Sequence, residues 1–332
     1  MQKFINSLWY RKKIARYLYC LYPLTLIFYI IIHIRKLIYK LIATSIKKPI
    51  IIVGNLNLGG GGKTPVVIYL AKMLQQKNYK VGIISRGYKS QHKKKYFIVK
   101  KNSHPSLTGD EALLIKQKTL CPVVISKNRV LAAKKLIENY TVDVIISDDG
   151  LQHYLLFRNI EIIVVDGKKK FGNSQLLPLG PLREPLSRLH KADFVFSNNQ
   201  NILNIIKNKY KQNNTYLLLQ NLVYCYNKDQ HRKKLSEFKN KTVHAVAGIA
   251  NPENFFQQLQ IFGINIIKHA FADHYNYKND DLDFNDNLDI LLTEKDAIKC
   301  KLKNNFWIVK YDIKIIDFEN FYLKLFNKIN KK

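Results

Sequence analysis

The chain has 332 residues, which is enough for about two domains, since one domain has ~100–200 residues. Hydrophobic residues make up 47% of it and aromatic residues 12%, which excludes a disordered polyelectrolyte. A net charge of +31 favours an anionic partner: nucleic acid, an acidic membrane surface or a phosphorylated substrate; alternatively, many of the lysines simply solvate the surface. The four cysteines are scattered and include no C-x-x-C pair, which indicates neither a disulfide framework nor a zinc site and favours a reducing, cytosolic setting.

The N-terminal segment, residues 1–46, contains the most apolar stretch of the chain. Residues 17–34 carry no formal charge and have basic residues on both sides. A helix of this length covers ~27 Å, close to the hydrocarbon thickness of a bilayer, although Pro23, Thr25 and His33 weaken a spanning helix. No small-residue cleavage site follows, so we expect the segment to be retained as a membrane-associated helix. The alternative is a buried helix that covers the next domain.

A core domain is expected over residues 47–222, where apolar strands alternate with helix-length segments. Strands are predicted at residues 50–55, 81–85, 122–126, 142–147 and 160–165, and helices at residues 64–74, from residue 110 onward and at residues 130–137. This alternation is typical of an α/β fold with an open parallel sheet and helices on both faces. Ligands bind such sheets at the carboxyl ends of the strands.

A smaller C-terminal α/β domain is expected over residues 223–332. The segments 199–214 and 227–241 are polar, which indicates a change of structural unit near residues 220–240. Strands are then predicted at residues 243–249, 264–271, 290–293 and 306–311, with a helix that begins near Pro252. In the segment TEKDA we expect Thr293 to cap the helix that Glu294 begins, and the alternative is contact with a nucleotide base.

The sequence NLGGGGKT at residues 57–64 predicts a phosphate-binding loop of the P-loop NTPase type. It follows a buried strand and opens a helix, so a helix N-terminus would point at the phosphates. Lys63 is expected to reach the β- and γ-phosphates of a nucleotide and Thr64 to hold Mg²⁺. The predicted nucleotide-binding residues are Asn57, Leu58, Gly59, Gly60, Gly61, Gly62, Lys63 and Thr64. The usual pattern has glycine where Asn57 stands, so the alternative is a glycine-rich turn with an incidental lysine.

Two carboxylates follow a neighbouring strand. Asp148 and Asp149 come directly after the strand at residues 142–147, and Gly150 permits a sharp exit. Nucleotide-bound Mg²⁺ needs an acidic partner, and we expect Asp148 or Asp149 to supply it. The alternative is a simple strand-ending turn.

With these motifs placed, the sequence resembles the lipid A 4′-kinase (tetraacyldisaccharide 4′-kinase) family over nearly its whole length. The shared motifs are VGNLNLGGGGKTP at 53–65, ISRGYKS at 84–90, TGDEALL at 108–114, DDGLQH at 148–153, FGNSQLLPLGPLREPLSRL at 171–189, FADH at 271–274 and TEKDA at 293–297. The resemblance implies transfer of the γ-phosphate of ATP to the 4′-hydroxyl of tetraacyldisaccharide 1-phosphate, with ATP and Mg²⁺ as cofactors. It also implies a place at the cytoplasmic face of the inner membrane, with an acylated disaccharide phosphate and the anionic membrane surface as partners.

The resemblance assigns roles to further residues. It implies that Asp110 is the catalytic base and that His274 orients it, beside the catalytic Lys63. A helix-capping role for Asp110 and a surface position for His274 are the alternatives. Residues with a possible substrate-binding or supporting role are Glu111, Arg129, His153, Arg183 and Glu184, although for Arg183 and Glu184, as for Arg188, a structural salt bridge is equally expected.

Two other functions compete with this interpretation. A membrane ATPase with a deviant phosphate loop would need a lysine just before the paired glycines, where this chain has Leu58. A nucleic-acid-binding protein would need basic clusters interleaved with stacking aromatics, and the nearest approach is the isolated run at residues 89–97. We therefore expect no nucleic-acid partner.

Overall fold

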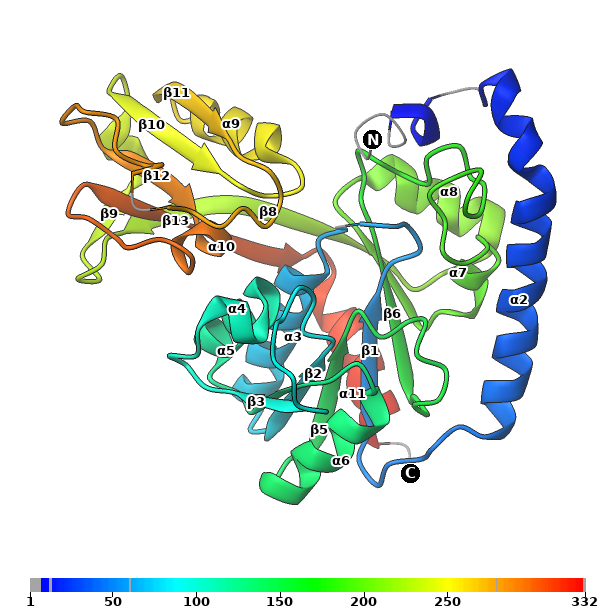
Figure 1. Ribbon diagram of the computed structural model, residues 1–332. Coiled ribbons are helices and arrows are strands. Elements are labelled where there is room, and N and C mark those ends of the chain that lie inside the picture. The colour runs from blue at the N-terminus through cyan, green and yellow to red at the C-terminus, as the bar shows by residue number, and fades with distance from the viewer. Residues whose placement is uncertain (1–6, 12–13, 60, 279, 331–332) are drawn as a thin grey trace.

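The computed structural model describes residues 7–11, 14–59, 61–278 and 280–330 (Figure 1). Gly60 of the predicted phosphate loop and the first six residues of the N-terminal segment lie outside these ranges. The described chain forms a core unit, a smaller C-terminal unit and a long N-terminal helix on the outer side of the core unit (Figure 1).

The core unit is built on a mostly parallel sheet. Its strands, in spatial order, are β3 (Phe97–Val99), β4 (Val123–Ile125), β2 (Val81–Ser85), β5 (Val144–Asp148), β1 (Ile50–Gly54), β6 (Ile160–Val165), β7 (Phe194–Ser197) and β8 (Thr215–Tyr226). β3 runs antiparallel to β4, and the other neighbouring pairs are parallel. The apolar runs of β1, β5 and β6 are buried on both faces, which confirms the predicted parallel sheet.

Helices cover both faces of this sheet. One face carries α3 (Lys63–Gln76), α5 (Asp110–Thr119) and α11 (Phe318–Asn330), and the short α4 (Pro105–Thr108) precedes α5. The other carries α6 (Arg129–Asn139), α7 (Arg188–Lys191), α8 (Gln200–Tyr210) and the N-terminal helix. Two apolar clusters separated by the sheet therefore form the main core, as the predicted fold class requires.

The C-terminal unit continues the same sheet. Its strands are β11 (Asn265–Ala270), β10 (Thr242–Ala247), β12 (Ile290–Thr293) and β13 (Phe306–Ile315), with β9 (Arg232–Lys234) beside β8. Its helices are α9 (Pro252–Ile261), α10 (Glu294–Ala297) and the 3₁₀ turn η2 (Leu235–Phe238). Phe255 and Phe256 of α9 and Trp307 of β13 give this unit an apolar cluster of its own.

Two strands join the units. β8 lies parallel to β7 at its start and then pairs antiparallel with β13, so both strands reach from one unit into the other (Figure 1). The boundary predicted between residues 222 and 223 falls inside β8. The last helix, α11, returns to the core unit, because Phe321 packs with Phe194 and Phe196 at ring distances of 5.2 and 5.1 Å. Aromatic burial thus places the end of the chain with the core unit.

The polar segment at residues 199–214 contains α8, which the sequence analysis did not predict. Asn199 caps this helix by accepting a hydrogen bond from the Ile202 backbone N–H. Only Ile202, Leu203 and Ile206 are buried, and the other faces carry Asn, Lys and Gln. A narrow apolar stripe is enough because the helix lies on the outer surface of the sheet.

The N-terminal helix α2 (Tyr22–Leu41) follows the 3₁₀ turn η1 (Arg16–Leu21). Phe28 and Ile32 pack on the core unit, and the Leu179 backbone N–H donates to the Thr25 hydroxyl at 3.3 Å. The opposite face exposes a continuous set of apolar side chains: Leu24, Ile27, Ile30, Ile31, Ile34, Leu37, Ile38 and Leu41.

Within the described residues, the stretch Arg16–Tyr39 is the one candidate for a membrane-spanning helix by length and composition. Only 17% of its apolar window is buried. The helix therefore covers part of the core unit, as in the alternative, but it is mostly exposed rather than buried.

Candidate active site

The predicted phosphate loop connects the end of β1 to the start of α3. Gly62 is the N-cap of α3 with φ of 73°, and Gly59 has φ of 97°, a region of backbone space that side chains with a Cβ rarely occupy. A Cβ at Gly61 would lie 2.8 Å from the Asn55 Nδ2 atom. Gly59, Gly61 and Gly62 are thus required for the path of the loop.

Asn55, which the sequence analysis did not single out, holds this loop together. Its Nδ2 donates to the Gly59 carbonyl at 3.1 Å, and its Oδ1 accepts a hydrogen bond from the Lys63 Nζ at 3.1 Å. The Lys63 ammonium is also 3.4 Å from the Asp149 carboxylate. The feature of the sequence that could have pointed to Asn55 is its position directly after a fully buried strand.

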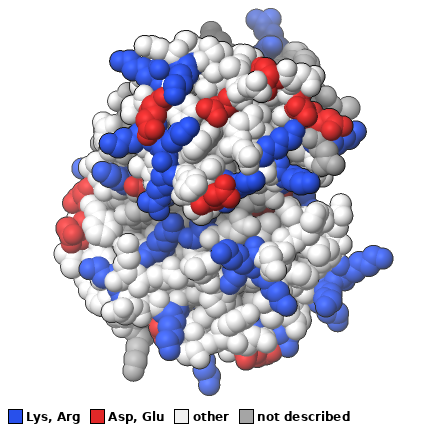
Figure 2. All heavy atoms as spheres, turned by 90° about the vertical axis from the view of Figure 1, so that its left-hand side faces the viewer, with Lys and Arg blue, Asp and Glu red and all other residues white. Residues whose placement is uncertain are grey.

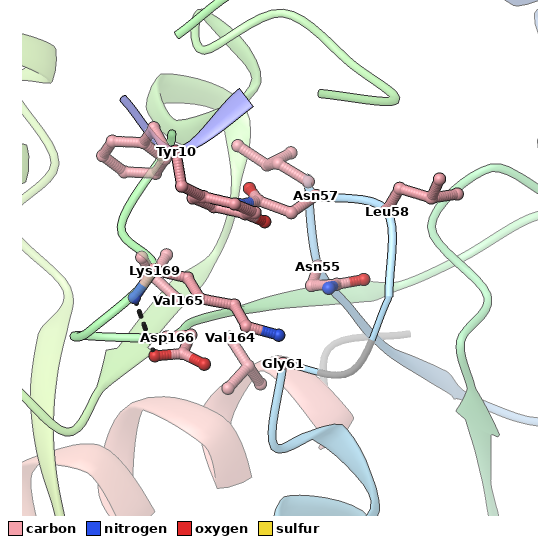
Figure 3. Close-up of a pocket in the computed structure, with 11 residues that line it drawn as sticks. Tyr10, Asn55, Asn57, Leu58, Gly61, Val164, Val165, Asp166 and Lys169 are labelled. Atoms are coloured by element: carbon pink, nitrogen blue, oxygen red, sulfur yellow. Dashed lines mark hydrogen bonds between the residues drawn. The ribbon is translucent and has the colours of Figure 1, made fainter. Parts of the chain in front are cut away.

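The first two residues of the loop, Asn57 and Leu58, make hydrogen bonds within the protein. The Asn57 Nδ2 donates to the Lys170 carbonyl at 3.1 Å and lies 3.4 Å from the Tyr10 hydroxyl, and the Leu58 N–H donates to the Pro181 carbonyl. Figure 3 shows Asn57 on the side of Tyr10, whereas the Leu58 side chain points to the other side of the loop. The Asn57 amide and the Leu58 N–H are therefore engaged within the protein, and nucleotide binding by residues 57–64 stays a prediction.

The two carboxylates after β5 differ in their partners. Asp148 is 1% exposed; its Oδ2 accepts a hydrogen bond from the Ser85 hydroxyl at 3.2 Å, and its Oδ1 is buried without a hydrogen-bond partner. Burial and the negative charges of Glu111 and Asp149 raise the pKa of Asp148 to about 7. Burial alone would raise the pKa of Asp149 too, but the cations Lys63 and Arg183 lower it to about 2.

An unpartnered buried carboxylate oxygen beside a second carboxylate fits a cation. The Thr64 hydroxyl, at the start of α3, would supply the third oxygen of the predicted Mg²⁺ set. Oxygen donors of this type are the ones that Mg²⁺ prefers. The residues present are therefore suited to the predicted metal.

Arg129 and His153 lie next to these carboxylates. Arg129 is 2% exposed and donates to the backbone carbonyls of Ser126, at 2.7 Å, and Asp148, at 3.1 Å. Burial lowers the pKa of Arg129 to about 10, so the guanidinium remains charged. Burial and then Arg129 lower the pKa of His153 to about 3, which keeps its imidazole neutral. The contacts of Arg129 match the supporting role rather than direct contact with substrate.

Arg183 and Glu184 have different surroundings. Arg183 Nη1 is 3.3 Å from the Asp149 carboxylate and 3.3 Å from the Gln152 side-chain oxygen. Glu184 is 1% exposed and pairs with Arg188, which also pairs with Glu161. Arg183 therefore reaches the predicted metal site, whereas Glu184 and Arg188 form the structural salt bridge that was the alternative.

Asp110 and His274 meet across the two units. The His274 Nδ1 lies 3.0 Å from the Asp110 Oδ2, and each side chain is 9% exposed. Burial would raise the pKa of Asp110, but the hydrogen bond from His274 and the ammonium of Lys299 hold it below the usual range. Gly109 is the N-cap of α5, where no side-chain capping bond forms. Asp110 is therefore not the N-cap, although it does lie in the first turn of α5, where the helix dipole favours an acidic residue, and the surface position for His274 is wrong.

Three further side chains surround this pair. The Tyr88 ring packs edge-on against the His274 ring at 5.5 Å. Lys295 Nζ is 3.3 Å from the His274 Nε2, and Lys299 Nζ is 3.7 Å from the Asp110 Oδ2. Both lysines belong to the segment around α10, where Thr293 caps the helix by accepting a hydrogen bond from the Asp296 N–H, as predicted. No pattern in the sequence indicates that this segment faces Asp110.

One cavity of about 490 Å³ is lined by the phosphate loop and by residues next to Asp110 and His274. It lies within the range of about 300 to 1,000 Å³ found for ligand pockets. Its walls include Gly61, Lys63 and Thr64 from the loop, Glu111 beside Asp110, and Lys295 beside His274. The basic side chains in these walls are Lys63, Lys72, Lys118, Lys168, Lys169, Lys295 and Lys310.

Figure 2 shows that Lys and Arg gather along the hollow between the two units. Such a charge distribution attracts an anionic ligand into the cavity. The parallel sheet, the glycine loop at a helix N-terminus, the buried carboxylate pair and the Asp–His pair together define a phosphoryl-transfer enzyme of the P-loop class.

Comparison with known proteins defines the family. A sequence model of the tetraacyldisaccharide-1-P 4′-kinase family, LpxK, matches residues 17–330. The tetraacyldisaccharide 4′-kinase of Ruthia magnifica is 44% identical over 304 residues, covering 90% of this chain and 94% of that protein. That of Nitrosococcus oceani is 42% identical over 313 residues, covering 92% and 89%. The chain belongs to the tetraacyldisaccharide-1-P 4′-kinase family, which confirms the resemblance seen in its motifs.

The fold agrees with this family. The crystal structure of Aquifex aeolicus LpxK in complex with ATP aligns with a TM-score of 0.80 and 28% identity, over 94% of this chain and 99% of that one. The predicted fold class is thereby confirmed.

Proposed function

We propose that the protein transfers the γ-phosphate of ATP to the 4′-hydroxyl of tetraacyldisaccharide 1-phosphate and forms the 1,4′-bisphosphate. The observation that carries this proposal is the cavity whose walls include the phosphate-binding loop together with Glu111, next to Asp110 in the chain, and Lys295, which contacts His274. A phosphate donor and a hydroxyl acceptor can meet there, which is the first requirement of a kinase.

The loop side of the cavity binds ATP in this proposal. The backbone N–H groups at Gly61 and Gly62 and the Lys63 ammonium offset the charge of the phosphates. Thr64, Asp148 and Asp149 would hold Mg²⁺, which when bound neutralises phosphate charge and orients the γ-phosphate. Arg183 holds the Asp149 carboxylate, and Arg129 holds the backbone carbonyl of Asp148.

The opposite side prepares the acceptor. The 4′-oxygen forms a bond to the γ-phosphorus while the bond from that phosphorus to the β,γ-bridging oxygen breaks, and ADP leaves. The proton of the 4′-hydroxyl passes to the carboxylate of Asp110, whose low pKa keeps it ionised. His274 donates its Nδ1 proton to Asp110 in a hydrogen bond and so fixes the orientation of that carboxylate.

The exposed apolar face of α2 positions the enzyme at the membrane. Side chains such as Ile27 and Ile31 are about half exposed and would be buried in lipid at the cytoplasmic face of the inner membrane. Tyrosines at residues 17, 19 and 22 near the start of the helix suit the interface. An acylated substrate would then present its sugar headgroup to the cavity without leaving the bilayer. The basic side chains serve phosphate groups and anionic lipid rather than nucleic acid.

Transfer of radiolabelled γ-phosphate tests this function. The parent protein in detergent micelles, with Mg²⁺, ATP and tetraacyldisaccharide 1-phosphate, is expected to give labelled lipid, and Lys63→Ala and Asp110→Ala are expected to give almost none. ATP hydrolysis without labelled lipid would overturn the acceptor and favour the membrane ATPase.

A further inference from the structure

Lys299 is a buried cation on the second unit that the proposed mechanism has not used. Its side chain is 2% exposed, and its ammonium lies 3.7 Å from the Asp110 Oδ2 and 3.1 Å from the Asp296 Oδ1. The Tyr277 ring centre is 5.2 Å away. A buried ammonium is costly unless it is paired, so this arrangement is a specific ion pair and not a solvated surface charge.

Asp296 holds Lys299 in place. It is fully buried, and its Oδ2 accepts hydrogen bonds from the Thr293 hydroxyl at 2.6 Å and from the Gly248 N–H at 3.0 Å. Because both bonds go to Oδ2, the other oxygen is left to face Lys299. The Lys299 ammonium is therefore held by Asp296, which is itself hydrogen-bonded within the C-terminal unit.

Lys299 and His274 meet the same oxygen of Asp110. The His274 Nδ1 lies 3.0 Å and the Lys299 Nζ 3.7 Å from Oδ2. Neither contact uses Oδ1. The carboxylate is thus held by one oxygen while the other is available to an acceptor.

We propose that Lys299 is a positioning residue for phosphoryl transfer: it keeps Asp110 ionised and turned so that Oδ1 meets the acceptor hydroxyl. Lys295 completes the arrangement. An ammonium can only donate, so the His274 Nε2, 3.3 Å from Lys295 Nζ, accepts and the imidazole proton stays on Nδ1, facing Asp110. This inference rests on the proposed function, in which Asp110 is the base.

The other charges near Asp110 do not cancel this effect. The groups that face it from the C-terminal unit are His274, Lys295 and Lys299. Two further carboxylates, Asp273 and Asp296, lie behind the lysines and pair with them. On α5 itself the neighbouring Glu111 faces Asp148, whose pKa it raises.

The cations that act on Asp110 thus all come from the other unit. Asp110 therefore has its cationic partners only where the core unit and the C-terminal unit are in contact.

The pH profile of kcat/KM for the lipid tests the role of Lys299. Loss of a nearby cation raises the pKa of a carboxylate, so the acid limb of Lys299→Met is expected to move up by about one pH unit or more. At neutral pH the variant is expected to lose about tenfold or more and to recover at higher pH, with KM for ATP unchanged. Lys299→Arg should retain most of the activity. Lys301→Met removes the same charge from an exposed neighbour and serves as the control.

Several outcomes would overturn the proposal. If Lys299→Met lowers kcat/KM equally at all pH values and leaves the acid limb of the profile where it is in the parent, Lys299 has only a structural role. If Lys299→Met does not fold, as judged by thermal unfolding, Lys295→Met carries the test, because its side chain is 17% exposed and its loss frees the His274 Nε2. An unmoved limb there also rejects the arrangement. A parent protein that labels no lipid would instead overturn the proposed function.

Discussion

The two sides of the cavity are built in different ways. Lys63 begins the helix that follows β1 and its loop, and Asp148 and Asp149 lie at the end of β5. β1 and β5 are neighbours in one sheet and paired in register, with Val53 opposite Asp148. Asp110 and His274 are 164 positions apart and come from different units. The loop side is therefore fixed by the sheet itself, whereas the acceptor side depends on how the two units meet.

The two sides of the cavity should therefore respond differently to substitution. A change on the loop side removes one charge from a rigid framework, so its effect should stay local. A change on the acceptor side alters a contact that both units share, so residues there should act jointly.

Lys63→Ala should have the largest effect. The variant loses the only side-chain ammonium that the loop aims at the phosphates, and kcat is expected to fall by about 10³-fold, because charge offset is a main term in phosphoryl transfer. Steady-state labelling of the lipid measures it, with Lys80→Ala, an exposed lysine, as the control. Retention of more than about a tenth of the parent rate would contradict the role of the loop.

Asp110→Asn and His274→Gln should be strongly non-additive. Loss of the proton acceptor is expected to cost about 10²–10⁴-fold in kcat and loss of His274 less, since it acts through Asp110. The double variant should be no worse than Asp110→Asn alone. Because the pKa of Asp110 lies below its usual range, the parent should lose activity only as the pH falls into the acid range. Multiplied effects in the double variant would show that the two residues act independently.

Gly109→Ala should damage the acceptor side through its backbone. Gly109 has φ of 78°, and a Cβ there would lie 2.4 Å from the Tyr88 carbonyl oxygen, so Asp110 must shift. We expect kcat to fall about tenfold or more, while KM for ATP stays near that of the parent. Gly263→Ala is the control, because its φ of 72° is equally unusual but its nearest neighbour is the flexible Lys239 side chain. An equal fall of kcat in Gly109→Ala and Gly263→Ala would mean that the loss of activity comes from general destabilisation of the protein.

Ile31→Glu should have the smallest effect and leave the loop side untouched. A carboxylate on the exposed face of α2 is costly to insert into lipid, so binding to anionic vesicles should weaken and KM for lipid in vesicles rise several-fold, about 3- to 10-fold. KM for ATP should not change. Flotation with vesicles measures binding, and Ile261→Glu, on an exposed isoleucine of α9, is the control. Equal vesicle binding by parent and Ile31→Glu would contradict the membrane role of this face.

The same contrast explains what the sequence could predict. The strand, loop and helix around Lys63, and the carboxylates after β5, follow from local patterns, because each motif is continuous in the chain. Asp110 and His274 became candidates only through the family resemblance. Nothing local marks Lys299 as their neighbour, because the contact arises from how two units pack.

Part of the fold was missed for a related reason. α8 is polar apart from a narrow stripe, and α11 follows the C-terminal unit in sequence yet packs on Phe194 and Phe196 of β7. In β8 the pattern of buried residues changes along the strand, since its two halves belong to different surroundings. Such elements are determined by distant partners, which a single sequence does not reveal.

The strands β8 and β13 also determine how the molecule comes apart. Their pairing runs from Ile308 opposite Tyr226 to Ile315 opposite Leu218, with a bulge at Lys310 and Tyr311, and Leu222 and Leu218 of β8 belong to the apolar clusters of different units. Neither unit can melt without breaking a strand of the other. The described chain should therefore denature in one cooperative transition, and a protein cut after residue 222 should yield two fragments that are each unable to fold alone.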